Sequence, residues 1–434
     1  MVNRGRRQDQ IQAPVFTRGL VRVFPFLNLS WNHGENPNRD LVPRIMEKTP
    51  IATSFVVPGH IPQLDGLRGL AVLLVLISHS GYLEALPHAR MLKHGRFGVD
   101  LFFVLSGFLI TGILVDSKSS EHYFRNFYAR RALRIWPLYY LILFVALIAV
   151  PLFAPAMRAT AARNWPAFVF YVQNIAFIQS DNNYPFALGA TWSLAVEEQF
   201  YLTWPVLVFL LRKRALAVVS ASLIVVSLSL RLVGYFHGAP IGFIHFFTLS
   251  RLDAIALGSL AAIWLRSPNC TVVRWRILAY QFLGLGVAGM VLARILMPKN
   301  GSVVGYTFMA FAFTGLLGLS LICNPQSSLL GRCLSARWLR YIGRISYGLY
   351  LLHGPIFLVW LRFMDSRGFL PYNEVVRNSL AFTGQFLSAT LAASISWWLF
   401  EEPILRLKER FPSGSEMHWP AETPIATLRA SVSH

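Results

Sequence analysis

Charged residues are scarce in this chain: Asp, Glu, Lys and Arg make up 14% of its 434 residues, whereas hydrophobic residues make up 55%. The apolar residues form blocks about as long as a bilayer is thick, which excludes an ordinary soluble globular protein. Acidic residues are the scarcest, with 20 Asp and Glu against 40 Lys and Arg. In a soluble protein this excess would suggest a nucleic-acid partner. Here the positive charge falls on alternate loops, so it indicates membrane topology, and no nucleic-acid partner is predicted.

Cysteine is also rare. Cys270, Cys323 and Cys333 all lie in or beside loops that the charge pattern assigns to the cytoplasm, so no disulfide framework is predicted. No internal repeat is visible, and neither a metal site nor a bound cofactor is predicted. The first 60 residues lack the apolar core and the small-residue cleavage site of a signal peptide.

Three regions are predicted. Residues 1–60 form a basic extension rich in Pro and Asn, which we expect to be flexible and cytoplasmic, and Met46 within it is a second candidate translation start. Residues 61–405 form a transmembrane domain. Residues 406–434 form a polar cytoplasmic tail, and no soluble domain is expected at either end.

The apolar blocks predict an all-α, polytopic transmembrane helix bundle of about ten spans. The predicted spans lie near residues 66–83, 98–115, 136–153, 193–211, 215–233, 249–265, 277–296, 304–322, 342–361 and 380–400. A further apolar stretch at 165–178 contains Gln173 and Asn174. It is either re-entrant or an eleventh span, and its amides predict that it lines a surface or a cavity.

The distribution of Lys and Arg predicts an N-terminus in the cytoplasm. The predicted inside loops contain Arg125, Arg130, Arg131 and Arg134, then Arg212, Lys213 and Arg214, then Arg266, Arg274 and Arg276, then Arg332, Arg337, Arg340 and Arg344. The main exceptions outside are Arg90, Lys93 and Arg96. They either contact an anionic substrate or are simply solvated, and the two interpretations have equal weight.

The first predicted span carries the most informative polar residues. It begins with Asp65 and Arg68 and has His79 near its far end. An ionisable residue near hydrocarbon is costly unless it is paired or meets water, so it marks a functional site by default. Because histidine moves protons readily near neutral pH, His79 is the leading candidate for a catalytic base.

Asp100 lies at the predicted outer end of the second span, toward the same membrane face as His79. Its carboxylate either orients the imidazole and stabilises its charged form or simply caps the helix, and these alternatives have equal weight. Arg131 and Arg134 are three residues apart on one helical face at the predicted cytoplasmic border. Arginine forks bind phosphates, although the positive-inside rule alone also places arginines here and is the favoured explanation on spacing only.

Further polar residues mark three other spans. Glu197 and Glu198 open one span, and we expect one to meet a cavity and the other to lie at the interface. Arg251 and Asp253 begin another, two residues apart, so each requires a different partner, and we interpret them as structural ion-pair members. In a third span, Ser346, Tyr350 and His353 follow helical spacing and form a polar stripe. A structural role is the favoured interpretation of His353.

The phrases that contain these residues resemble the bacterial acyltransferase 3 family of integral-membrane O-acyltransferases, over roughly residues 61–405. The matching phrases are L-D-G-L-R-G-L followed by His79, G-V-D-L-F-F-V-L-S-G-F-L-I, R-A-L-R before I-W-P-L-Y-Y, W-S-L-A-V-E-E-Q-F-Y-L, R-L-D-A-I-A-L-G, I-S-Y-G-L-Y-L-L-H and W-L-F-E-E-P. The resemblance implies that His79 is the essential histidine, that Arg131 and Arg134 are the arginine pair, and that Glu197 is the family's glutamate. The N-terminal extension is unusual for the family, and the extracellular hydrolase-like domain of some members is missing.

The resemblance implies transfer of an acyl group, most readily acetyl, from acyl-coenzyme A to a hydroxyl of a cell-surface or exported glycan or a lipid-linked saccharide. It also implies a multi-pass protein of the bacterial inner membrane that contacts lipid. Arg131 and Arg134 would hold the donor phosphates, and His79 would deprotonate the acceptor or carry the acyl group itself. A secondary transporter or a lipid-linked glycan flippase is the alternative, although neither inverted repeats nor paired broken helices are visible. The acceptor, the acyl chain and the oligomeric state are not predicted.

Overall fold

The computed structural model describes residues 54–56, 61–80, 97–149, 165–178, 186–297, 300–367, 374–412 and 418–420. The chain divides into two compact units, Met1–Ala52 and Thr53–His434, and all described residues belong to the second. The predictions made for residues 1–53, for Arg90, Lys93 and Arg96, and for most of the tail therefore fall outside the described residues.

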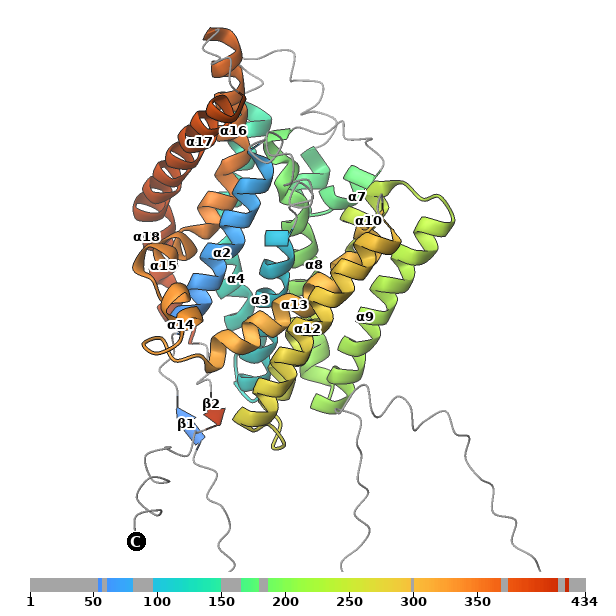
Figure 1. Ribbon diagram of the computed structural model, residues 1–434. Coiled ribbons are helices and arrows are strands. Elements are labelled where there is room, and N and C mark those ends of the chain that lie inside the picture. Colours follow the sequence, from blue (N-terminus) through green and yellow to red (C-terminus); the bar gives the residue numbers. More distant parts are fainter. Residues whose placement is uncertain are drawn as a thin grey trace, which may run out of the picture. The chain divides into compact units, whose positions relative to one another are not determined.

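The described part of the chain is almost entirely helical (Figure 1). Its helices in chain order are α2 (Pro62–His79), α3 (Phe97–Asp116), α4 (Tyr123–Phe144) with the π-turn η4 (Val145–Ala149), α7 (Gln173–Ile178), η6 (Phe186–Thr191), α8 (Trp192–Leu210), α9 (Lys213–Phe236), α10 (Ile241–Phe246), η7 (Thr248–Ser250), α11 (Leu252–Leu265), α12 (Val272–Leu296), α13 (Ser302–Ile322), α14 (Leu329–Leu334), α15 (Arg337–Arg344), α16 (Ser346–Arg367), α17 (Glu374–Ser396), η8 (Trp397–Glu401), α18 (Glu402–Arg406) and η9 (Leu407–Arg410). The only strands in this part are β1 (Ser54–Val56) and β2 (His418–Pro420), which pair antiparallel.

The all-α prediction is confirmed, and each of the ten predicted stretches is helical for most of its length. The predicted number of spans is not reached. Among the described residues five helices are long and apolar enough to cross a membrane, or six if the bent pair α15 and α16, at 72°, forms one span. α2 and α8 are long enough but fall outside this set, because the polar residues of the site candidates reduce their apolar character.

One boundary was predicted wrongly, and one of the two alternatives for the stretch at 165–178 is excluded. The span expected at 136–153 begins thirteen residues earlier, since α4 starts at Tyr123, so Arg131 and Arg134 lie within the helix and not in a loop before it. Their backbones are therefore about 12 Å and 17 Å from its first residue at 1.5 Å per residue. The stretch at 165–178 is not an eleventh span. The helix in its second half, α7, has six residues, which is too short to cross a membrane. Gln173 and Asn174 in it are fully buried and do not line the cavity described below, so the prediction that they line a surface or a cavity is not confirmed.

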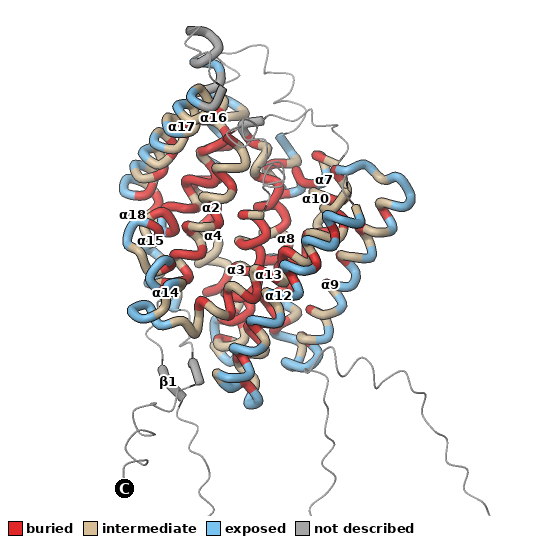
Figure 2. Tube along the Cα trace, viewed as in Figure 1, coloured by how far each residue is buried: buried red, intermediate tan, exposed pale blue. Residues whose placement is uncertain are grey.

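Burial separates the central helices from the peripheral ones (Figure 2). In α3, 72% of the apolar window is buried, against 22% in α9 and in α12. α3 and α11 approach most closely at Gly107 and Gly258, where an added Cβ would lie 1.9 Å from the Ile255 carbonyl oxygen and 2.1 Å from that of Val104, respectively. Only glycine permits such contact between helix backbones, and small residues of this kind are typical of membrane helix interfaces.

The peripheral helices expose large apolar side chains such as Val225, Phe236, Val291 and Leu296. Water would penalise so much exposed apolar surface, whereas lipid would not. The molecule is therefore a multi-pass membrane protein. The residues that line the candidate site lie on α2, α3, α4, α8 and α16.

Candidate functional site

A cavity of about 120 Å³ lies among α2, α3, α4, α8 and α16. Six of the twelve predicted site residues line it, namely Arg68, Arg131, Arg134, Glu197, Ser346 and Tyr350. Its other lining residues are Val99, Phe102, Phe103, Ser106, Ile135, Ser193, Leu194, Tyr201 and Tyr347. The sequence therefore predicted the charged residues of this cavity and two of its hydroxyl groups, whereas Ser106, Ser193, Tyr201, Tyr347 and the apolar lining were not predicted.

Arg131 and Arg134 are the most unusual members of the cavity. Within the described part of the chain, neither guanidinium has a hydrogen-bond or ion-pair partner, and the buried Nε of Arg131 is unsatisfied. Arg131 lies instead near two aromatic rings, with its Cζ 5.8 Å from the centre of Phe127 and 5.9 Å from that of Tyr201. Guanidinium groups that line a cavity without protein acceptors are suited to bind an anion.

Arg68, which also lines the cavity, differs from Arg131 and Arg134 because it has a partner. It donates to Asp65 at 3.1 Å, one helical turn earlier on α2. Both members of this ion pair were singled out in the sequence. Since Asp65 does not line the cavity and Arg68 does, the pair presents its positive member to the cavity.

Glu197 is held at the cavity wall by a short chain of hydroxyl groups. Ser106 on α3 donates to Glu197 Oε1 at 2.8 Å, and the Tyr201 hydroxyl donates to Ser106 at 3.0 Å. Glu198 does not line the cavity, and Trp136 donates to it at 3.4 Å. One of the two adjacent glutamates therefore lines the cavity, as expected, whereas the membrane-interface position expected for the other stays a prediction.

The two histidines singled out in the sequence meet each other. The rings of His79 at the end of α2 and His353 within α16 have centroids 5.1 Å apart in an edge-to-face arrangement. The Nδ1–H of His79 donates to the Val75 carbonyl at 2.9 Å, and that of His353 donates to the Tyr350 carbonyl at 2.5 Å. These bonds leave the basic lone pair of each neutral imidazole on Nε2.

Tyr350 connects the histidine pair to the cavity. Its side chain lines the cavity, where its hydroxyl forms a 2.6 Å hydrogen bond with Ser193 and donates to the Ala190 carbonyl at 2.7 Å. Its own carbonyl accepts the bond from His353. The polar stripe of Ser346, Tyr350 and His353 therefore runs from the cavity to the two imidazoles.

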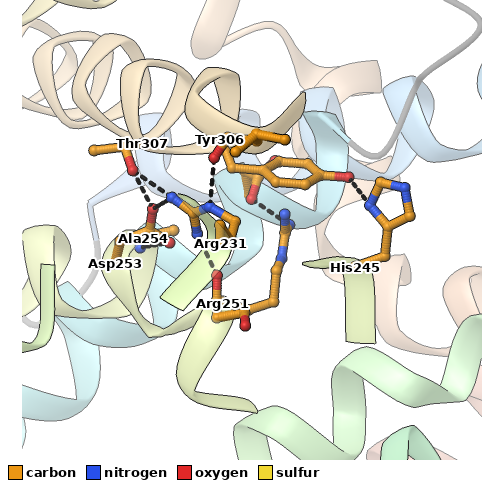
Figure 3. A network of polar contacts seen from close by, with 10 residues as sticks. Arg231, His245, Arg251, Asp253, Ala254, Tyr306 and Thr307 are labelled. Atoms are coloured by element: carbon orange, nitrogen blue, oxygen red, sulfur yellow. Dashed lines mark hydrogen bonds and ion pairs between the residues drawn. The ribbon is translucent and has the colours of Figure 1, made fainter. Parts of the chain in front are cut away.

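Asp100, Arg251 and Asp253 belong to a buried network and do not line the cavity. Figure 3 shows Arg231, Arg251, Asp253, Tyr306 and Thr307 of this network. Arg251 donates to Asp100 at 2.6 Å, and Arg231 on α9 donates to Asp253 at 2.7 Å. The different partners predicted for Arg251 and Asp253 are thus present. Arg231 was missed, although a lone arginine inside the apolar stretch at 215–233 is itself a signal of intramembrane pairing.

The network extends to α13 and α10. Arg231 also donates to Thr307 at 2.5 Å, to the Val303 carbonyl at 2.8 Å and to the Ser250 carbonyl. The Arg251 guanidinium lies 3.5 Å from the centre of the Tyr306 ring, whose hydroxyl bonds with Nδ1 of His245 at 2.7 Å. So many contacts at fully buried groups indicate that this network joins α3, α9, α11 and α13 structurally.

Two charged residues near the cavity were not singled out in the sequence. Glu401 is buried in the π-turn η8, accepts from Ser396 at 3.1 Å, and packs so close to α16 that a Cβ on Gly348 would lie 2.6 Å from its Oε1. Lys408 in η9 is half-buried beside the arginines of α4. Among the described residues no group of three or more His, Cys, Asp or Glu side chains could hold a metal ion.

Comparison with known proteins places this site in a family. A family model described as an acyltransferase domain matches residues 61–401. YrhL of Bacillus subtilis is 33% identical over 320 residues, which are 69% of this chain and 49% of YrhL. The O-acetyltransferase OatA of Staphylococcus aureus is 32% identical over 364 residues (80% of this chain, 57% of OatA), and the peptidoglycan O-acetyltransferase OatA of Listeria monocytogenes is 31% identical over 318 residues (68% and 49%).

The chain thus spans about half the length of the curated relatives it matches. No solved structure matches it. Because the family model covers most of the chain, including every helix that lines the cavity, the assignment rests on the whole membrane domain. The chain belongs to the acyltransferase 3 family of bacterial membrane proteins.

Proposed function

We propose that this protein transfers an acetyl group from acetyl-coenzyme A to a hydroxyl of a cell-surface or exported glycan. The observation that carries the proposal is the pair of unpartnered guanidinium groups, Arg131 and Arg134, in the cavity wall. Phosphates are the natural acceptors for such forks, and coenzyme A carries several of them. The family assignment and the acetyltransferase relatives support the same reaction.

The acyl end of the donor would occupy the cavity of about 120 Å³, and the nucleotide would stay outside it. The nucleotide would therefore lie at the mouth, toward the start of α4, with its phosphates reached by Arg131 and Arg134. The pantetheine arm would extend past Glu197 and Tyr350 toward the histidine pair.

The reaction itself is assigned to His79. Its Nε2 would take the proton of the acceptor hydroxyl while the hydroxyl oxygen attacks the thioester carbonyl, and the coenzyme A thiolate would leave. In the alternative route Nε2 attacks first and carries the acetyl group briefly. The bond from Nδ1 to the Val75 carbonyl supports both routes, because it keeps the lone pair on Nε2.

Spacing along α2 supports transfer between the two membrane faces. Asp65 and His79 are fourteen residues apart, or about 21 Å at 1.5 Å per residue. We propose ten spans with a cytoplasmic N-terminus in the bacterial inner membrane, which places the arginines nearer the cytoplasm and His79 nearer the opposite face. The acceptor would then be a glycan or lipid-linked saccharide outside the cytoplasm.

The test is acetyl-coenzyme A turnover by purified protein in lipid nanodiscs. Free coenzyme A is measured by mass spectrometry with and without an added glycan acceptor, for wild type and for His79→Gln. Release by wild type that depends on acceptor and on His79 supports the transferase. Transport of glycan without coenzyme A release would instead indicate a transporter or flippase.

The acceptor is identified separately. Surface glycans and secreted metabolites of a deletion strain are compared with those of wild type by mass spectrometry. A glycan that loses an acetyl group in the deletion strain and regains it on complementation is the acceptor. Unchanged acetylation of all glycans would contradict the proposed substrate class.

A further inference from the structure

Lys408 is turned toward the protein, unlike its neighbours. In η9 it is half-buried, whereas Leu407, Glu409 and Arg410 are exposed. A lysine at the end of the last helix could extend into solvent at no cost, and long charged side chains near helix ends normally do so. Its inward orientation therefore requires a reason.

Hydrogen bonds from α4 hold the backbone around Lys408 in place. One Nη of Arg130 donates to the carbonyls of Lys408 at 3.1 Å and Phe411 at 2.8 Å. Asn126, one turn earlier on the same face of α4, donates to the Pro412 carbonyl at 2.9 Å. Three bonds thus attach residues 408–412 to the helix that carries Arg131 and Arg134.

Positive charges act on the Lys408 ammonium from two helices. Arg130, Arg131 and Arg134 belong to α4, which contacts η9, and Arg68 belongs to α2. Burial, the largest cause, and then these four arginines lower the pKa of Lys408 from 10.5 to about 6.

Nearby acids do not balance this charge. Asp65 is paired with Arg68, and the charge of Glu401 is felt mainly by Arg134. Glu402 lies 3.5 Å from Arg406, and Glu409 is exposed. Within the described part of the chain Lys408 has no hydrogen-bond or ion-pair partner for its ammonium. Repulsion among cations in one place is typical of a site that binds an anion.

We propose that Lys408 is a further binding residue for the donor phosphates and that it takes up a proton when they bind. This inference rests on the proposed function, since it assumes that coenzyme A occupies the mouth of the cavity. In the empty protein at neutral pH the side chain is a neutral amine. A bound phosphate supplies negative charge, and the amine then gains one proton from solvent to become an ammonium.

The proposal predicts how donor affinity depends on pH. Between the pKa of the empty protein and the higher pKa of the complex, each bound donor brings one proton with it. Affinity then falls as pH rises, by up to tenfold per pH unit. Because pH 7.5 lies above the lowered pKa of Lys408, the amine of the empty protein is mostly neutral there, and the uptake approaches one proton.

The experiment is calorimetric titration of coenzyme A into the purified protein in nanodiscs. Titrations at pH 7.5 in buffers of different ionisation enthalpy give the number of protons taken up. Titrations from pH 6.5 to 8.5 give the change in coenzyme A affinity per pH unit. The variants are Lys408→Arg, which keeps the charge at every pH, and Lys408→Met. Lys118→Met is the matched control, because its ammonium donates to the Leu211 carbonyl at 2.7 Å away from the cluster. Pantetheine, which lacks phosphates, is the control ligand.

Lys408→Arg is expected to bind coenzyme A with about one proton fewer than wild type and with little dependence on pH. Lys408→Met is expected to lose the same uptake and at least tenfold in affinity at pH 6.5, and Lys118→Met to match wild type. Equal proton numbers and equal slopes in wild type and Lys408→Arg would overturn the inference, even if Lys408→Met fails to fold. The proposed donor site fails separately, if wild type does not bind coenzyme A or if Arg131→Ala plus Arg134→Ala binds it normally.

Discussion

The arginine pair gives the most direct test of the donor site. Replacing Arg131 and Arg134 together with alanine removes the two guanidinium groups that have no partner within the described part of the chain. Because no protein hydrogen bond or ion pair is broken, no buried acceptor is left unsatisfied. We therefore expect the double variant to insert and fold like wild type while losing donor affinity.

The expected loss follows from the kind of contact removed. A hydrogen bond to a charged group contributes about 1.5 to 3 kcal/mol, so two guanidinium–phosphate contacts contribute about 3 to 6 kcal/mol if they add. At 1.4 kcal/mol per factor of ten, this corresponds to a rise of about 10² to 10⁴ in the apparent KM for acetyl-coenzyme A. Arg68 remains in the cavity, so the lower end is expected. Each single variant should show a smaller rise.

The assay measures coenzyme A release against donor concentration in nanodiscs, with thermal unfolding of the same samples. Arg212→Ala plus Arg214→Ala is the control, because it removes two positive charges from exposed positions at the start of α9. If the Arg131 and Arg134 double variant folds normally and keeps the wild-type KM, the two arginines only determine topology, and the proposed donor site is refuted.

Three further predictions concern catalysis, stability and the N-terminal extension. His79→Ala should lower acetylation of the native acceptor by on the order of 10² to 10⁴, measured in membranes with matched protein levels, whereas near-normal transfer would remove this residue from the mechanism. Arg231→Met leaves the buried carboxylate of Asp253 without its cation, so the variant should lose about 3 to 5 kcal/mol of stability. Adding Asp253→Leu should recover part of that loss in thermal unfolding; a double variant less stable than the single one would contradict the pairing. Translation from Met46 should give a fully active enzyme, because residues 1–45 contain no predicted span or motif, and an inserted but inactive truncation would show otherwise.

The helices could be predicted because their signal is local. Runs of apolar residues and the turns between them identified each helical stretch, and the resulting boundaries were mostly within a few residues. The exception was α4, whose first half is rich in arginine and therefore does not resemble a span. An amphipathic first half of this kind is stable only because neighbouring helices enclose a polar cavity, and hydropathy does not contain that information.

The candidate site was predicted as a set of residues but not as an arrangement. His79 and His353 are 274 positions apart in the chain, and their contact depends on α2 and α16 packing side by side. The same holds for Ser106, an ordinary serine in an apolar helix that becomes notable only because it donates to Glu197. Contacts between distant helices follow from packing, which sequence spacing alone does not determine.

Buried and cavity-lining arginines illustrate this limit most clearly. Arg231, Arg251 and Arg131 are the same residue type, and residue type alone does not tell a paired arginine from an unpaired one. Arg231 and Arg251 have carboxylate partners at 2.7 and 2.6 Å, so their charges are used inside the protein. Arg131 has aromatic rings beside it and no carboxylate within ion-pair distance among the described residues, so its charge is available to a ligand. The presence or absence of a protein acceptor thus separates a structural arginine from a binding one. Removing a structural arginine should lower stability, whereas removing a binding arginine should lower donor affinity.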